Sequence, residues 1–183
     1  MKGLFRKAIP GLAAAVLIAP VGLNAAVSNT KSLSRLENEV RHELVMLPWF
    51  SIFDNLKFQV RDNNEVVLSG QVTRPTLKAD AQRVVERIEG VERVVNNVEV
   101  LPLSPFDDRI RMAVARSIFG YGPMYRYALG ANPPIHIIVK NGHVTLEGIV
   151  ANEMDKNIAN LRANSVSGVF SVTNNLAVEN ARG

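Results

Sequence analysis

Apolar residues recur along this chain first with the spacing of a helix and then with that of strands, and this succession occurs twice. Near residues 36–47 and again near 110–118, apolar side chains return every three or four positions and so share one helix face. The two stripes are Leu36, Val40, Leu44 and Leu47, and then Ile110, Val114 and Ile118. Two segments that alternate apolar and polar residues follow each stripe, which indicates half-buried strands. We therefore expect a helix and a strand pair in each half.

The turn between the paired strands fixes their register. Asn141 and Gly142 favour a tight hairpin in the second half, because both residues adopt positive φ readily; the corresponding turn in the first half, residues 62–64, is one residue longer. On the apolar face, the alternation then predicts pairs of Val139 with Val144, Ile137 with Leu146, Val60 with Val66 and Phe58 with Leu68. On the other face of the second hairpin it pairs Lys140 with His143 and His136 with Glu147.

A second helix and a third strand complete each half. The second apolar stripes are Leu77, Ala81, Val84, Val85 and Ile88, and a looser set of Ile158, Leu161, Ala163 and Val166. We expect Gly90 and Gly168 to cap these helices, because glycine adopts a left-handed conformation at little cost. The valines that follow predict the third strand. Since a helix separates it from the second strand, the connection is a crossover.

The two halves are copies of one module. Residues 90–100 recur as residues 168–178 with six identical positions out of eleven, and Gly70 and Gly148 precede the two segments at the same interval. The residues before these two glycines differ, so we expect the glycine itself to have the structural role. The paired asparagines in the repeat favour a turn or bulge satisfied by their own side chains, rather than a binding site.

These patterns predict an α+β fold of two tandem small modules at residues 33–101 and 106–179. Each has the order helix-strand-strand-helix-strand, with a three-stranded mixed sheet packed on two helices. Two prolines in residues 101–105 restrict the linker, and we expect a separate core in each module. Asp107 and Asp108 favour the start of the second module's first helix, where carboxylates accept from free backbone amides.

The element order, the V-x-L-x-G hairpin and the closing G-V-x-x-V-x-N-N-x-x-V pattern resemble the BON-domain family. The resemblance covers both modules. It implies a role in the bacterial envelope, binding phospholipid or partner proteins, without enzymatic activity or a cofactor. Some outer-membrane members of the family carry a lipid on a cysteine; this chain has no cysteine and departs from them.

The N-terminal residues, 1–26, have the features of a secretory signal. A basic start precedes the apolar run 12–23, and small residues near Ala26 allow cleavage. An uncleaved membrane anchor is the alternative, but Pro20 and Gly22 interrupt a run shorter than the ~20 residues that span a bilayer. We expect a periplasmic protein, cleaved near Ala26.

Charge and composition narrow the classes of partner. The formal net charge of +4 includes three basic residues of the segment 1–26, and the remainder has 18 basic and 17 acidic residues, a net +1. So balanced a chain lacks the concentrated basic face that nucleic acid requires. The absence of cysteine excludes disulfides and thiol nucleophiles. The three histidines are not expected to converge, and we expect neither a metal site nor a small-molecule substrate.

Aromatic residues gather between the first helix and the first strand of each module. Seven of the ten aromatic residues outside 1–26 lie there, and all three tyrosines belong to the longer loop of the second module. This loop either closes the end of a small core or forms a contact surface, and the two roles are compatible. Our candidate membrane or partner contacts are Trp49, Phe50, Arg111, Arg116, Tyr121, Tyr125, Arg126 and Tyr127.

Two functions of different classes remain. The first is binding to an anionic phospholipid surface, which clustered arginines favour. The second is interaction with envelope proteins, including a holdase role. Residues 33–101 hold nine basic and eleven acidic residues, whereas residues 106–179 hold seven and six. The second module is therefore the better candidate for an anionic surface.

Overall fold

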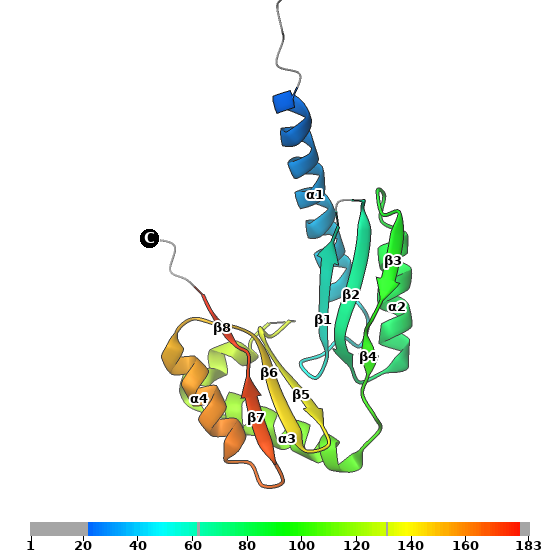
Figure 1. Cartoon of the computed structure of the whole chain (residues 1–183). Helices are drawn as coiled ribbons and strands as arrows, with labels where there is room; N and C mark the ends of the chain where they lie inside the picture. The colour runs from blue at the N-terminus through cyan, green and yellow to red at the C-terminus, as the bar shows by residue number, and fades with distance from the viewer. Residues whose placement is uncertain (1–21, 62, 131, 180–183) are drawn as a thin grey trace, which may run out of the picture.

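The computed structural model describes residues 22–61, 63–130 and 132–179, which form two successive α+β modules (Figure 1). The first module consists of α1 (Gly22–Val45), β1 (Asn55–Val60), β2 (Glu65–Val72), α2 (Pro75–Glu86), β3 (Arg93–Asn96) and β4 (Glu99–Val100). The second consists of α3 (Pro105–Phe119), the 3-10 helix η1 (Gly122–Ala128), β5 (Ile135–Lys140), β6 (His143–Val150), α4 (Glu153–Asn164), β7 (Ser171–Asn174) and β8 (Ala177–Val178).

Each module has one mixed sheet with its helices on one face. The strand orders are β1-β2-β3 and β5-β6-β7, and β4 and β8 add to the ends of β2 and β6. The hairpin pairs are antiparallel, whereas β3, β4, β7 and β8 run parallel to the central strands, as a helical crossover requires. All six predicted cross-strand pairs are confirmed.

The predicted apolar stripes form two cores. The stripes of α1 and α3 are buried throughout, and so are Leu77, Ala81, Val85 and Ile88 after β2. In α4 the buried residues are Asp155, Ala159 and Ala163. Leu161 is 68% exposed, so its predicted place in the core is wrong. The stripe of α4 is short because small alanines, rather than leucines, face the sheet.

Two predicted helix ends differ in the structure. The α2 and α4 helices have their C-caps at Arg87 and Ser165, in αR conformation, and not at the glycines. Gly90 and Gly168 do have positive φ, 95° and 90°, but they lie in the turn that leads to the third strand. At the start of α3, Ser104 provides the cap by accepting from the Asp107 amide at 3.2 Å.

Asp107 links α3 to the neighbouring hairpin instead of capping its own helix. Its buried carboxylate accepts from the Asn141 amide at 2.9 Å and from the Gly142 amide at 2.8 Å. Charge-assisted bonds of this kind are about twice as strong as neutral ones. The first turn of α3 is therefore tied to the β5–β6 turn.

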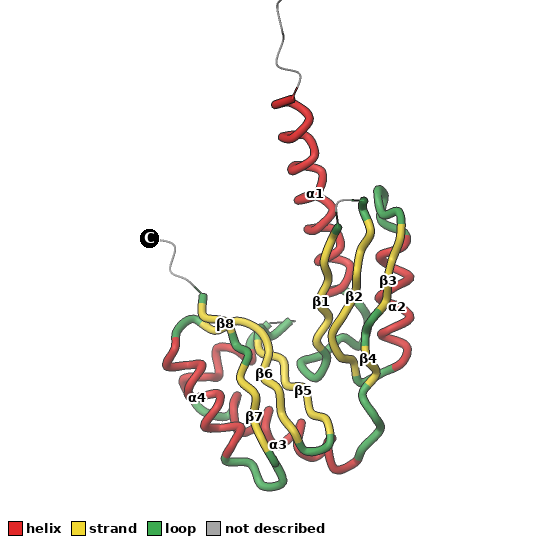
Figure 2. Tube along the Cα trace, viewed as in Figure 1, coloured by secondary structure: helices red, strands yellow, loops and turns green. Residues whose placement is uncertain are grey.

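The paired asparagines form a bulge, as predicted, which divides the third strand of each module (Figure 2). Asn96 donates from Nδ2 to the Lys78 carbonyl at 2.9 Å and accepts the Val98 amide at 3.2 Å. Asn174 makes the same two bonds, to the Lys156 carbonyl and from the Leu176 amide. One side chain thus satisfies the interrupted strand and ties it to the second helix.

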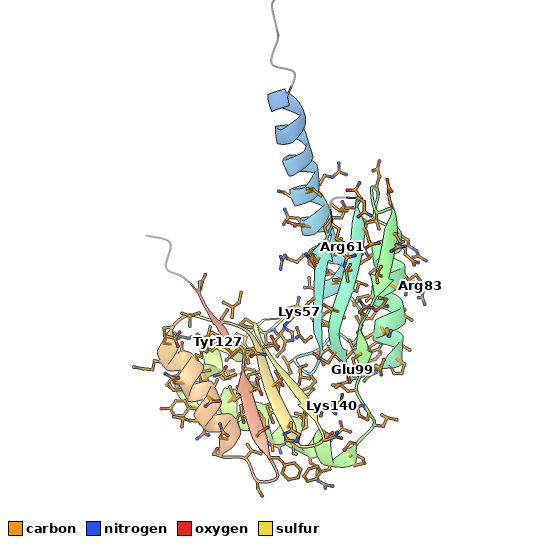
Figure 3. The ribbon with its side chains drawn as sticks, viewed as in Figure 1. Lys57, Arg61, Arg83, Glu99, Tyr127 and Lys140 are labelled. Atoms are coloured by element: carbon orange, nitrogen blue, oxygen red, sulfur yellow. The ribbon has the colours of Figure 1, made fainter. Side chains whose placement is uncertain are left out.

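The modules contact one another along β5, the edge strand of the second sheet. The Ile137 amide of β5 donates to the Ile52 carbonyl of the first module at 2.7 Å. Ile52 and Phe53 also pack against the second core. Figure 3 shows Lys57 and Lys140 on the side where the modules meet. Two ion pairs cross this junction, Lys57 Nζ to Glu147 Oε2 at 2.9 Å and Lys140 Nζ to Glu99 Oε1 at 2.5 Å.

The expected secretory segment lies mostly outside the described residues. The α1 helix begins at Gly22 and continues through Ala26, so cleavage near that residue stays a prediction. Among the described residues, no helix is both long and apolar enough to cross a membrane.

We predict that Gly148→Ala destabilises the protein by about 3 kcal/mol or more. A Cβ at this position would lie 1.9 Å from the Pro134 carbonyl oxygen, and the glycine has φ of +118°. Gly122→Ala is the control, because nothing lies within 4 Å of its Cβ position. Chemical denaturation measures both. Equal unfolding free energies for the two variants would contradict this account.

A partly buried histidine, His136, lies at the module junction. The His136 ring lies 5.6 Å from the ring of Phe50, centroid to centroid. Burial lowers the pKa of His136, and this effect is opposed by the backbones of Asp54 and Ser51 and by the carboxylates of Asp54 and Glu147. A lowered pKa means that the folded protein takes up the proton less readily than the unfolded chain does.

The contribution of His136 to stability is therefore intact above its ordinary pKa of about 6.5 and is lost as the pH falls below that value. We expect the melting temperature of the full chain to fall more between about pH 7.5 and about pH 5.5 than that of His136→Gln. His143→Gln should behave as the parent protein, because this residue is exposed. Identical pH profiles for the parent and His136→Gln would refute the prediction. Neither the His136→Gln nor the His143→Gln substitution alters the residues of the Lys57–Glu147 ion pair at the junction.

Candidate functional site

The tyrosine loop of the second module folds as η1, which has a buried and an exposed side. Met124 is fully buried and Tyr127 is 7% exposed, and both belong to the second core. Tyr125 lies between them in sequence and is 59% exposed, and Tyr121 is 40% exposed. The loop is thus a lid on one side and a free surface on the other, so both predicted roles are structurally available.

Tyr127 holds the lid through its hydroxyl group. The hydroxyl donates to Asp155 Oδ2 at 2.6 Å and accepts from the Ala151 amide at 2.8 Å. Asp155 is buried at the first turn of α4, where Asn152 Nδ2 also donates to it at 3.1 Å. These bonds connect η1, the end of β6 and the start of α4. Tyr127 is therefore a structural residue, which corrects its predicted place on a contact surface.

Arg126 lies at the edge of the same network and remains exposed. Its guanidinium donates to the Tyr127 hydroxyl at 3.2 Å and forms an ion pair with Asp155. Hydrogen bonds to Tyr127 and Asp155 raise the pKa of Arg126. Its Cζ also lies 5.0 Å from the centre of the Tyr127 ring. The cation is therefore fixed beside the Tyr127 ring, although Asp155 offsets part of its charge.

A second arginine, Arg162 of α4, joins the exposed side. Its Cζ lies 5.3 Å from the centre of the Tyr121 ring, and its Nε donates to the Ser117 carbonyl at 2.8 Å. The sequence analysis did not select Arg162, because only the fold brings α4 next to the tyrosine loop. We define the η1–α4 surface as seven residues of η1, its two flanking positions and α4, of which all but the half-buried Arg162 are exposed: Tyr121, Tyr125, Arg126, Leu129, Met154, Leu161 and Arg162.

Arg111 is not on that surface. It is only 4% exposed, pairs with Asp108 and donates from Nη2 to the Val139 carbonyl at 2.8 Å. A guanidinium held inside the protein cannot lie on a membrane, which corrects the prediction for this residue. Arg116 is exposed, but it lines a separate groove of about 560 Å³ along α3, with Phe106 and Arg109.

Trp49 and Phe50 lie with Arg111 at a cleft between the modules. Trp49 is 70% exposed and Phe50 is half-buried. This inter-module cleft has a volume of about 590 Å³, and its walls also include Arg74, Leu103 and Met112. The predicted contact residues thus divide among three places, the η1–α4 surface, the α3 groove and the inter-module cleft.

His136 and His143 have different surroundings. His136 faces Phe50 at the junction, and His143 shares a 2.7 Å hydrogen bond with Ser171 Oγ. In the part of the chain that the structure describes, no three His, Asp or Glu side chains are grouped so that they could hold a metal ion.

The family model of the BON domain matches residues 32–102 and 126–180. The chain belongs to the BON-domain family. BON proteins are in general non-catalytic and periplasmic or membrane-associated, and they bind phospholipids or other proteins. The second match begins within η1, so it leaves out α3.

Solved structures similar to this BON protein include two of CdsD, a structural protein of the type III secretion system of Chlamydia trachomatis, one of them its C-terminal domain. Both are 14% identical, cover 79% of this chain and have a TM-score of 0.32; the matches cover 92% and 97% of the respective CdsD chains. No curated protein matches the sequence.

Proposed function

We propose that this BON protein is an exported, periplasmic protein that binds anionic phospholipid surfaces through its second module and contributes to protection against envelope or osmotic stress. In this proposal it is related in organisation to the osmotically inducible periplasmic protein Y. The observation that supports the binding site is the position of Tyr125, an exposed ring on a 3-10 turn whose other side is fixed in the core.

The chemistry of the η1–α4 surface suits a lipid headgroup region. Tyrosine rings are favoured where one side is apolar and the other is wet, and adjacent cations attract anionic lipids. Arg126 and Arg162 lie beside tyrosine rings, and Leu129, Met154 and Leu161 are more than half exposed. Tyr125 would insert shallowly while the guanidinium groups remain at the level of the phosphates.

A protein partner is the second candidate, and the apolar residues of α4 favour it. Met154 and Leu161 are 71% and 68% exposed, and lie seven positions apart on one helix face. Exposed apolar residues spaced in this way are typical of a helix face that binds another protein.

We predict that Tyr125→Ser reduces co-sedimentation with phosphatidylglycerol vesicles severalfold, because an interfacial ring is lost, with a change in melting temperature of about 1 °C or less. Phosphatidylcholine vesicles should bind weakly, and added salt should weaken binding to the anionic vesicles. Phe170→Ser is the matched control, because Phe170 is 69% exposed but lies after α4, outside the η1–α4 surface.

Tyr127→Ser provides the opposite test. It should lower the free energy of unfolding by roughly 3 kcal/mol, because the ring and two hydrogen bonds, one buried and one partly buried, are lost. The fraction that remains folded should still bind vesicles. Full vesicle binding by folded Tyr125→Ser would refute the lipid proposal. Loss of binding to an envelope protein in the same variant would favour the protein-partner function.

The proposed export has its own test. We expect the protein recovered from the periplasm to have the intact mass of a chain that begins near residue 27. A species that begins at Met1 and fractionates with membranes would contradict this.

A further inference from the structure

The inter-module cleft has the composition of a binding site for an amphiphile. Three exposed apolar side chains converge on it from three separate segments: Trp49 from the loop after α1, Leu103 from the linker and Met112 from α3. They are 70%, 95% and 49% exposed. Scattered apolar side chains are ordinary on a protein surface, but three around one cleft indicate an apolar ligand.

Two guanidinium groups give the same cleft a positive charge. Arg74 is exposed, with its Cζ 5.0 Å from the centre of the Trp49 ring. Arg111 is almost fully buried in the wall, and its Nε has no hydrogen-bond partner among the described residues. A buried donor without an acceptor costs free energy, and an anion in the cleft would reduce this cost through its attraction to the guanidinium charge. Asp108 is the only acidic residue in the lining, so two positive charges face one negative charge.

The loop that carries Trp49 is held in an unusual conformation. Trp49 has φ of +70°, which is rare for a bulky residue. The loop is anchored by the buried Asp54, which accepts from the Ser51 amide at 3.0 Å and from the Thr73 amide at 2.7 Å. Such conformations persist where the surrounding structure enforces them, and they concentrate at functional sites. The exposed indole is therefore positioned by the protein beside the cleft.

We propose that the inter-module cleft binds a single-chain amphiphile with a carboxylate head, of the fatty-acid class. The carboxylate accepts from the exposed guanidinium of Arg74, a pairing that guanidinium geometry favours, and the buried Arg111 adds positive charge to the wall. The chain covers Trp49, Leu103 and Met112. The volume of about 590 Å³ suits one small ligand, whereas a protein partner requires a surface of about 800 Å². This site is separate from the η1–α4 surface and does not depend on the proposed vesicle binding.

Trp49 is the only tryptophan of the chain, so its emission reports on the cleft directly. We expect dodecanoate, below its micelle concentration, to shift the emission to shorter wavelength in a saturable way. Dodecanol, which lacks the charge, and acetate, which lacks the chain, should not do so. An equal shift with dodecanol, or none with dodecanoate, would overturn the proposal.

Variants locate the site. Arg74→Gln and Leu103→Glu change exposed residues, and each should weaken dodecanoate binding about tenfold or more, because a charge or an apolar contact is lost. Leu161→Glu on the η1–α4 surface and Tyr125→Ser should bind dodecanoate as the parent protein does. Unchanged affinity in Arg74→Gln and Leu103→Glu would refute the assignment. If a peptide with an apolar C-terminal residue binds more tightly than dodecanoate, the fatty-acid assignment is wrong and the ligand of the cleft is the C-terminal end of a polypeptide.

Discussion

The Pro134 carbonyl oxygen lies 1.9 Å from the place where a Cβ would stand at position 148, and the Asn55 oxygen has the same relation to Gly70. Only glycine permits this close approach. The approach allows each central strand to pair with its hairpin partner on one side and with a divided parallel strand on the other. The end of β6 then presents the Ala151 amide to Tyr127. The position of the lid therefore depends on the geometry of the central strand.

The register and the helical faces could be predicted because they depend on local features. The dipeptide at Asn141 and Gly142 specifies a tight turn, and every cross-strand pair follows from it once the alternation is known. Repetition strengthened the prediction, because the first module supports the same pairs despite a longer turn. The prediction for α4 failed at Leu161, because the apolar period of this helix is weak and its alanines, not Leu161, contact the sheet.

The chemical roles of single residues depend on elements that are distant in sequence, and the sequence alone did not show them. Asp107 has the position of a helix cap, but the amides that it accepts belong to a hairpin 34 and 35 residues later. Arg111 and Arg126 look alike in a charge count, yet one donates to the Val139 carbonyl inside the protein and the other remains exposed beside the Tyr127 ring. Burial, which separates the two, is a property of the packed fold.

The junction between the modules joins two different surfaces of one repeated unit, and contacts of this head-to-tail kind can in principle add further copies without end. Here the two copies of the repeat differ at positions that form the ion pairs of the junction. The second module has Ala177 where the first has Glu99, and the first has Ser69 where the second has Glu147. The second module could not take the place of the first in these ion pairs, because His136 and Ala177 stand where the first module has Lys57 and Glu99. The divergence of the copies therefore makes these two ion pairs specific to one arrangement, in which the first module supplies Lys57 and Glu99 and the second supplies Glu147 and Lys140.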